Sequence, residues 1–212
     1  MPETLIKPTR KHARQIADYL RVNGLKSGGG PAEPGKMCVE QVVCHIIGYP
    51  YSDNPPCVAP AVRSFKIALN DSGWSSNEAR ARGMARIAIA QLGSNEIDQN
   101  VFVKELALVT VRQIVPLALR AAAGMRGLHV EHKPKLEAQA VACEKVETLA
   151  AARAASYAAG DAAGDAAGDA ASAAARAAIA ASDKVLTMMA EIGVEALQSA
   201  GSPGCKWLTL VK

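Results

Sequence analysis

Residues 150–182 read AAARAASYAAGDAAGDAAGDAASAAARAAIAAS, and more than half of them are alanine. Alanine has the highest helix propensity of the amino acids, so the stretch predicts a long helical repeat. The tetrapeptide GDAA occurs three times in tandem. Residues four apart share a helix face, so in a helix the glycines would form one strip and the acids the next. These residues are Gly160, Gly164 and Gly168, and Asp161, Asp165 and Asp169. We interpret the acidic ladder as a solvated face, with binding of a cation or a basic partner as the alternative.

The rest of the chain has the composition of a helical protein with an aliphatic core. Half of the 212 residues are hydrophobic but only 4% are aromatic. Such a core favours closely packed helices over a β-sandwich, which relies on aromatic and β-branched residues. We therefore predict a single all-α domain over residues 1–212, an irregular helical bundle with flexible loops at 28–36 and 124–134.

Apolar residues spaced three and four apart predict the individual helices. We expect helices over 9–22, 37–47, 60–69, 75–91, 98–123 and 183–198, and a long helix from residue 135 that continues into the alanine run. The region 98–123 is the most apolar and is predicted to be the central buried element, with Pro116 either kinking it or starting a new helix. The tail 202–212 is predicted to be extended, with Trp207 docking it onto the body.

The cysteine content and the lack of a signal-peptide pattern predict a cytoplasmic protein, and the charge is concentrated at the N-terminus. Residues 1–36 carry seven Lys or Arg and three acids, which accounts for the whole net charge of +4. This basic first helix is most simply a solvated face, and nucleic-acid binding is the alternative. Five cysteines at irregular spacing indicate reduced thiols. The chain opens with no signal-peptide pattern and contains no uninterrupted apolar run long enough to cross a bilayer, so we expect no membrane association.

Two short patterns resemble chemical motifs without satisfying them. Residues 30–37, GPAEPGKM, match the spacing of a phosphate loop, but Met37 stands where Ser or Thr would bind Mg²⁺, and no strand precedes the loop. Lys36 and the following helix N-terminus remain a candidate anion site. Four soft ligands also lie between positions 38 and 57, but they lack the close Cys pair typical of zinc sites: Cys38, Cys44, His45 and Cys57. We expect no metal and no cofactor.

The loop 49–57, YPYSDNPPC, is the strongest candidate binding segment. Its three prolines stiffen the backbone, so the loop is ordered at low entropic cost. A structural role is favoured, in which Asp53 accepts backbone N–H groups in a turn. The alternative is that the loop presents side chains to a partner. The candidate binding residues are Tyr49, Tyr51, Ser52, Asp53, Cys57 and, from the preceding loop, Lys36.

Residues 36–71, KMCVEQVVCHIIGYPYSDNPPCVAPAVRSFKIALND, are similar to a segment of an uncharacterised family found in bacteria and phages. The pattern of that family is roughly M-C-x-x-E, then G-x-P-x-S-D-x-P-x-C-x-x-P, then L-N-D. Members of that family also carry alanine-rich helices. The resemblance implies no activity. The acidic position after Met-Cys falls on Gln41 in this chain, so the resemblance favours a structural role for the segment.

The leading functional hypothesis is a non-enzymatic interaction protein, such as a phage or mobile-element accessory factor that binds a host protein. A homo-oligomer is compatible with it. The first alternative is a small-molecule binder or enzyme with a pocket near Ser52, Asp53 and Cys57. The second is a nucleic-acid binder that uses the basic N-terminal helix. An enzyme requires a deep pocket with convergent ionisable groups. A nucleic-acid binder requires a continuous basic face, and a protein binder requires an exposed apolar surface.

Overall fold

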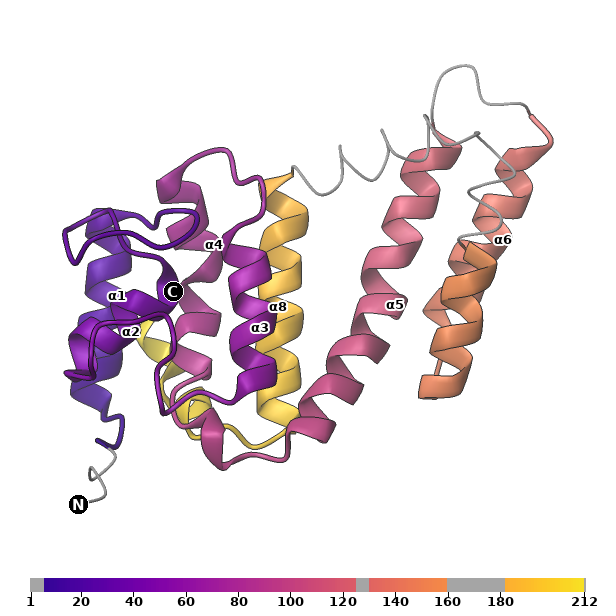
Figure 1. Ribbon diagram of the computed structural model, residues 1–212. Helices are drawn as coiled ribbons and strands as arrows, with labels where there is room; N and C mark the ends of the chain where they lie inside the picture. Colours follow the sequence, from indigo (N-terminus) through magenta and orange to yellow (C-terminus); the bar gives the residue numbers. More distant parts are fainter. Residues whose placement is uncertain (1–5, 125–129, 160–181, 212) are drawn as a thin grey trace.

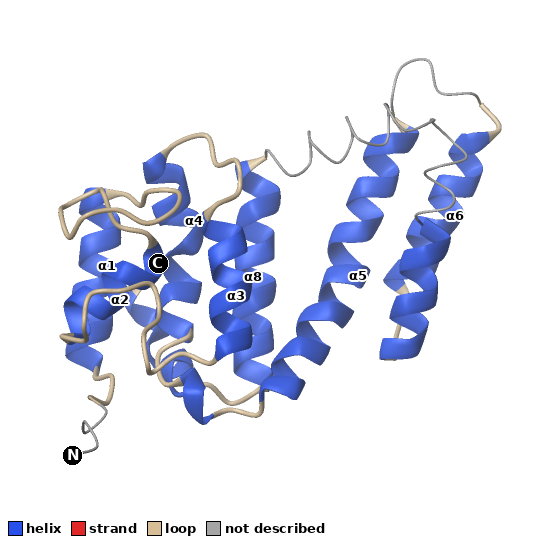
Figure 2. Cartoon of the chain, viewed as in Figure 1, coloured by secondary structure: helices blue, strands red, loops and turns tan. Residues whose placement is uncertain are grey.

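The computed structural model describes residues 6–124, 130–159 and 182–211, and these residues form helices and loops without a strand (Figure 2). This confirms the prediction of an all-α fold. In chain order the elements are α1 (Arg10–Asn23), α2 (Val39–Ile47), α3 (Pro60–Asn70), α4 (Asn77–Ala90), the short 3-10 helix η1 (Ser94–Glu96), α5 (Gln99–Ala123), α6 (His132–Glu144), α8 (Asp183–Ser199) and the 3-10 helix η2 (Pro203–Leu210).

Local capping chemistry fixes the starts of several helices close to where the sequence predicts them. Thr9 Oγ1 accepts the His12 N–H at 3.3 Å at the start of α1, and Ser76 Oγ accepts the Ala79 N–H at 3.1 Å at the start of α4. Each bond satisfies one of the N–H groups that a first helical turn leaves without a partner. The bounds of α1 to α4 agree with the predicted helices within one or two residues.

The buried side chains gather into two clusters, which we call the body core and the arm core. The body core is formed by α1 to α4, α8 and η2, together with Phe102 near the start of α5. The arm core lies between the rest of α5, α6 and the helical stretch 149–159. Figure 1 shows α5 rising beside α8 at its start and diverging from it toward the arm. The arm therefore attaches to the body mainly through the first half of α5.

The central buried helix is α4, and the prediction that 98–123 would occupy this place is wrong. Ten of the 14 residues of α4 are buried, whereas only six of the 25 residues of α5 are. Five alanines and one glycine are among the 14 residues of α4, so neighbouring helices approach it closely on several sides. The larger side chains Val103 and Leu117 of α5 remain 51% and 38% exposed. Pro116 lies within α5 without ending the helix.

Two further expectations about the second half of the chain are corrected. The helix predicted from residue 135 into the alanine run ends at Glu144, and a new helical stretch starts at 149. Thr148 Oγ1 accepts the Ala151 N–H at 3.2 Å and so caps this new start. The tail is a 3-10 helix over Pro203–Leu210 rather than extended chain, although Trp207 is buried as predicted. The three GDAA repeats lie outside the described residues.

Candidate functional site

The two predicted binding tyrosines hold neighbouring backbone in place. Tyr49 is buried, and its hydroxyl donates to the Ile6 carbonyl oxygen. Burial raises the pKa of Tyr49 well above its usual value. Tyr51 is exposed, and its hydroxyl donates to the Gly30 carbonyl oxygen at 2.7 Å. Both hydroxyls are therefore engaged in ordering other segments of the chain.

The turn chemistry expected of Asp53 belongs to its neighbour Ser52. Ser52 Oγ accepts the Asn54 N–H at 3.2 Å, a hydrogen bond to turn backbone of the kind that the sequence predicts for Asp53. The Asp53 carboxylate instead accepts a hydrogen bond from Arg63 Nη2 at 2.8 Å. Arg63 Nε also donates to the Asp53 carbonyl oxygen at 2.7 Å, so one guanidinium ties this loop to α3.

This division of roles predicts a ranking of two alanine variants. Asp53→Ala is expected to lower the free energy of unfolding by less than about 1 kcal/mol, because the half-exposed ion pair is weak and the bond to the backbone carbonyl remains. Ser52→Ala is expected to lower it by about 1 kcal/mol, because it removes the partner of a backbone N–H in the turn. Urea unfolding of both variants measures the ranking. A larger loss for Asp53→Ala than for Ser52→Ala would contradict it.

Cys57 and Lys36, the other predicted binding residues, do not meet in a common site. The Cys57 side chain is fully buried, and burial raises the pKa of its thiol to about 11. Lys36 is exposed and pairs with Glu33 at 2.7 Å. The hollow nearest Asp53 holds about 30 Å³ and is lined also by Cys38 and Asn70, but not by Cys57. That volume suits about one water molecule and is far below the size of a ligand pocket.

Polar side chains of α2 and of the residue that follows α3 hold the glycine-rich loop 27–37. The Gln41 amide oxygen accepts the N–H groups of Gly30 and Cys38, each at 3.1 Å, and thereby also caps α2. The Asp71 carboxylate accepts the Gly28 N–H at 2.7 Å. A Cβ at Gly30 would lie 2.1 Å from the Lys36 carbonyl oxygen, so the loop closes on itself where only glycine fits.

The least expected feature is an ion pair in the body core. Lys66 Nζ lies 2.8 Å from Glu40 Oε1, and both side chains are fully buried. The buried Gln91 amide lies beside the carboxylate, yet none of these polar atoms completes a well-aligned hydrogen bond with a described residue. Burial raises the pKa of Glu40 and lowers that of Lys66, and the opposite charge of the partner counteracts each shift.

Sequence reasoning missed this pair, although the sequence contains a signal. Glu40 lies among the buried residues Val39, Val42 and Val43 of α2. Lys66 occupies the buried side of α3 with Val62 and Leu69. A charged residue in phase with the apolar face of a helix is expected to have a buried partner. Both side chains are fully buried, so a substrate has no access to the pair. Its effect is on the stability of the body core.

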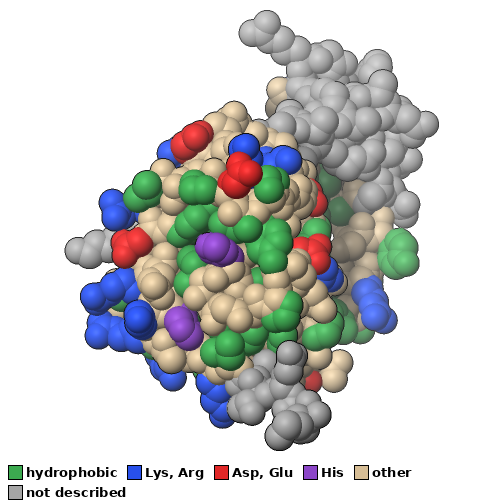
Figure 3. All heavy atoms as spheres, turned by 60° about the vertical axis from the view of Figure 1, so that its left-hand side comes forward, with side chains coloured by type: hydrophobic (Ala, Val, Ile, Leu, Met, Phe, Trp, Pro, Cys, Tyr) green, Lys and Arg blue, Asp and Glu red, His purple; other side chains and the backbone are tan. Residues whose placement is uncertain are grey.

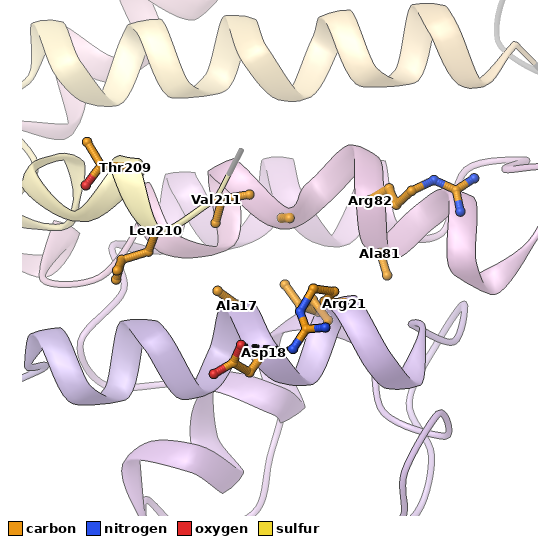
Figure 4. A pocket seen from close by; sticks show the side chains of 10 residues that line it. Ala17, Asp18, Arg21, Ala81, Arg82, Thr209, Leu210 and Val211 are labelled. Atoms are coloured by element: carbon orange, nitrogen blue, oxygen red, sulfur yellow. Dashed lines mark hydrogen bonds and ion pairs between the residues drawn. The ribbon is translucent and has the colours of Figure 1, made fainter.

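A hollow of ligand size, formed by described residues, lies between α1, α4 and η2, and we call it the α1–α4 groove. It holds about 500 Å³ and is open to solvent along one side. Its floor and walls are mainly small or apolar side chains, including Ala17, Ala81, Ala85 and Leu210. The three alanines come from α1 and α4, so both helices contribute short side chains to the space between them. Figure 4 shows these residues around the opening.

Three charged residues lie at the rim of the α1–α4 groove: Asp18, Arg21 and Arg82. Arg21 Nη2 lies 3.3 Å from Asp18 Oδ1, so these two largely neutralise one another (Figure 4). Arg82, on α4, is exposed and forms no ion pair with any residue that the structure describes. Hydrogen bonds from Ser75 hold the pKa of Asp183 below its usual value, and the more distant charge of Arg82 adds a smaller contribution. Hydrogen bonds lower the pKa of Glu78, one turn before Arg82 on α4, and Arg82 also contributes to that shift. The groove therefore combines an apolar floor with one cation that forms no ion pair with a described residue.

The predicted basic face at the N-terminus is interrupted. Lys7 pairs with Glu96 at 3.9 Å, and Lys36 and Arg21 have the acidic partners given above. Three exposed cations of α1 have no ion-pair partner among the described residues: Arg10, Lys11 and Arg14. On the face shown in Figure 3, Lys and Arg side chains gather at one edge, while hydrophobic side chains occupy much of the centre. This surface is mixed rather than a continuous basic stripe.

Comparison of the chain with protein-family models, curated proteins and solved structures gives no match. Within residues 6–124, 130–159 and 182–211, no group of three or more His, Cys, Asp or Glu is placed to hold a metal ion. Among the described helices, α5 is long and apolar enough to span a membrane by length and composition alone. Its most apolar 18-residue window has a mean hydropathy of 1.5 and is 28% buried. Core helices of soluble proteins meet the same criterion.

Proposed function

We propose that the chain is a non-enzymatic interaction module whose α1–α4 groove receives an apolar segment of a protein partner. The observation that carries the proposal is the groove itself, an apolar hollow of about 500 Å³ that opens along one side. Contiguous exposed apolar surface rimmed by polar residues is characteristic of protein interaction sites. The volume accommodates several side chains, and the open side leaves room for the backbone that carries them.

The chemistry of the groove favours binding over catalysis. Its ionisable rim consists of one internally paired acid and two arginines, and an arginine does not transfer protons near neutral pH. The described lining contains no His, Cys or Ser nucleophile. The acid–base groups most deeply buried, Glu40 and Lys66, are sealed in the body core away from this opening.

A groove-filling variant tests the proposal. Ala17 is half-buried at the groove, so Ala17→Trp is expected to occupy the space that a partner side chain would use. The matched control is Ala68→Trp, at an exposed position of α3 away from the groove. Affinity purification from the cells that encode the protein, with quantitative mass spectrometry, compares both variants with the unmodified chain.

We expect at least one protein to be enriched with the unmodified chain and with Ala68→Trp, and to fall by about tenfold or more with Ala17→Trp. The helical spectrum and melting temperature of the Ala17→Trp variant should stay close to those of the unmodified chain. Equal recovery of every enriched protein with a folded Ala17→Trp variant would contradict the assignment of the groove. Absence of any enriched protein would contradict the proposed function as a whole.

A further inference from the structure

We infer that the occupant of the α1–α4 groove is an apolar segment that carries carboxylates, and that the arginines bordering the groove select it against a basic segment. This inference rests on the proposed function and specifies the partner. It follows from two properties of the groove: the arrangement of cations along its α1 edge, and the cation on its α4 edge, which forms no ion pair with a described residue.

The α1 edge carries a row of arginines. Positions 10, 14, 17 and 21 follow one another at intervals of four, three and four along the helix, so they share one edge of it. Ala17 of this set lines the groove, as does Arg21. Arg10 and Arg14 extend the same edge by two turns toward the start of α1, and both are exposed. A segment lying along the groove would therefore pass three arginines on this side.

The α4 edge adds Arg82, which lies at the end of the groove away from Thr209 in Figure 4. Arg21 lies near the same end, on the opposite helix. Asp18 is the one acid in the lining, and its carboxylate is engaged with Arg21. Outside the lining, Glu78 and Asp183 lie near enough to Arg82 for its charge to lower their pKa values, but neither forms an ion pair with it. With Arg10 and Arg14 included, four arginines border the groove against these three acids, so the border carries a net positive charge. A carboxylate-bearing segment would find complementary charge there, whereas a lysine-bearing segment would meet like charge.

The combination of apolar floor and cationic border also suits the geometry of a helical partner. A helix presents apolar residues on one stripe and acidic residues on the flanks of that stripe. Docking the stripe on Ala17, Ala81 and Leu210 would bring flanking carboxylates toward arginines on both edges. Arginine is suited to this role because its planar guanidinium binds a carboxylate with two parallel hydrogen bonds.

A selection experiment with random peptides as the probe tests the inference. A displayed library of random peptides, each long enough for about four helical turns, is selected against the full chain. The recovered peptides are synthesised with a fluorescent label. Binding is measured by anisotropy for the unmodified chain, Ala17→Trp, Arg82→Glu and Arg14→Glu. The control for a general change in net charge is Arg153→Glu, at an exposed position of the arm.

We expect recovered peptides to combine Leu, Ile or aromatic residues with an excess of Asp and Glu, and to lose binding to Ala17→Trp. Arg82→Glu is expected to lower the affinity for these peptides about tenfold, and Arg153→Glu is expected to lower it less than about twofold. Replacing the Asp and Glu residues of the peptides by Lys should restore their binding to the Arg82→Glu variant. Groove-dependent peptides that are neutral or basic, or that are insensitive to both Arg14→Glu and Arg82→Glu, would overturn the inference alone. Recovery of no peptide sensitive to Ala17→Trp would overturn the proposed function together with it.

Discussion

Replacing Lys66 by methionine is expected to lower the free energy of unfolding by about 3–5 kcal/mol, because it leaves the Glu40 carboxylate buried without its counter-charge. The carboxylate is fully buried, and no described residue gives it a well-aligned hydrogen bond that could take the place of the ammonium. Glu40→Leu is expected to be similarly destabilising, since it leaves a buried ammonium among apolar side chains. For a chain of this length, such a loss lowers the melting temperature by about 10 °C.

The double variant Glu40→Leu/Lys66→Met is expected to give the opposite result. It replaces both charges by apolar side chains of similar volume, and buried ion pairs replaced in this way often leave stability unchanged or increase it by about 1–4 kcal/mol. The unmodified chain and the three variants form a double-mutant cycle, measured by urea unfolding. We expect the double variant to be at least as stable as the unmodified chain.

The exposed pair between Lys36 and Glu33 supplies the control for this cycle. Its charged atoms are 2.7 Å apart, nearly the same separation as in the buried pair, but the two side chains are 59% and 55% exposed. Lys36→Met is therefore expected to change the free energy of unfolding by less than about 1 kcal/mol. If the losses of unfolding free energy in the two single variants of the buried pair simply add in the double variant, the two charges are not coupled.

Gly204→Ala is expected to destabilise the chain by about 3 kcal/mol or more, because a Cβ at this position has no space. It would lie 2.2 Å from the Ile89 carbonyl oxygen and 2.8 Å from that of Ala90. Both neighbours are backbone atoms at the end of α4, the most buried helix, so they cannot rotate away. The variant must lift η2 from α4, which exposes Trp207 and Leu208 and opens one wall of the α1–α4 groove.

The matched control for this substitution is Gly73→Ala. An added Cβ there meets nothing within 4 Å, and the backbone of Gly73 does not have a positive φ. This variant is expected to stay within about 1 kcal/mol of the unmodified chain. Thermal unfolding followed by circular dichroism compares the two substitutions. Equal melting temperatures for Gly204→Ala and Gly73→Ala would contradict the close approach of η2 to α4.

The sequence by itself determined the local structure of the body. Apolar spacing and the capping residues Thr9 and Ser76 placed the first four helices, because these signals act within one or two helical turns. The three prolines of the loop 49–57 likewise restrict its backbone whatever it packs against. Local signals failed where neighbouring hydrogen-bond acceptors compete, since nothing local tells whether Ser52 or Asp53 will accept the turn N–H.

The tertiary structure alone decided which helix is central, where the ions meet and where the groove lies. The apolar content of 98–123 suggested a core helix, but alanine-rich α4 has this role because small side chains let several helices pack around it. Glu40 and Lys66 lie on different helices, and only packing makes them partners. The groove likewise depends on small side chains of two different helices, among them Ala17 of α1 and Ala81 of α4. Contacts between residues far apart in the sequence produce no periodic pattern, because they depend on the distance between the side chains in the folded structure and not on their spacing along the chain.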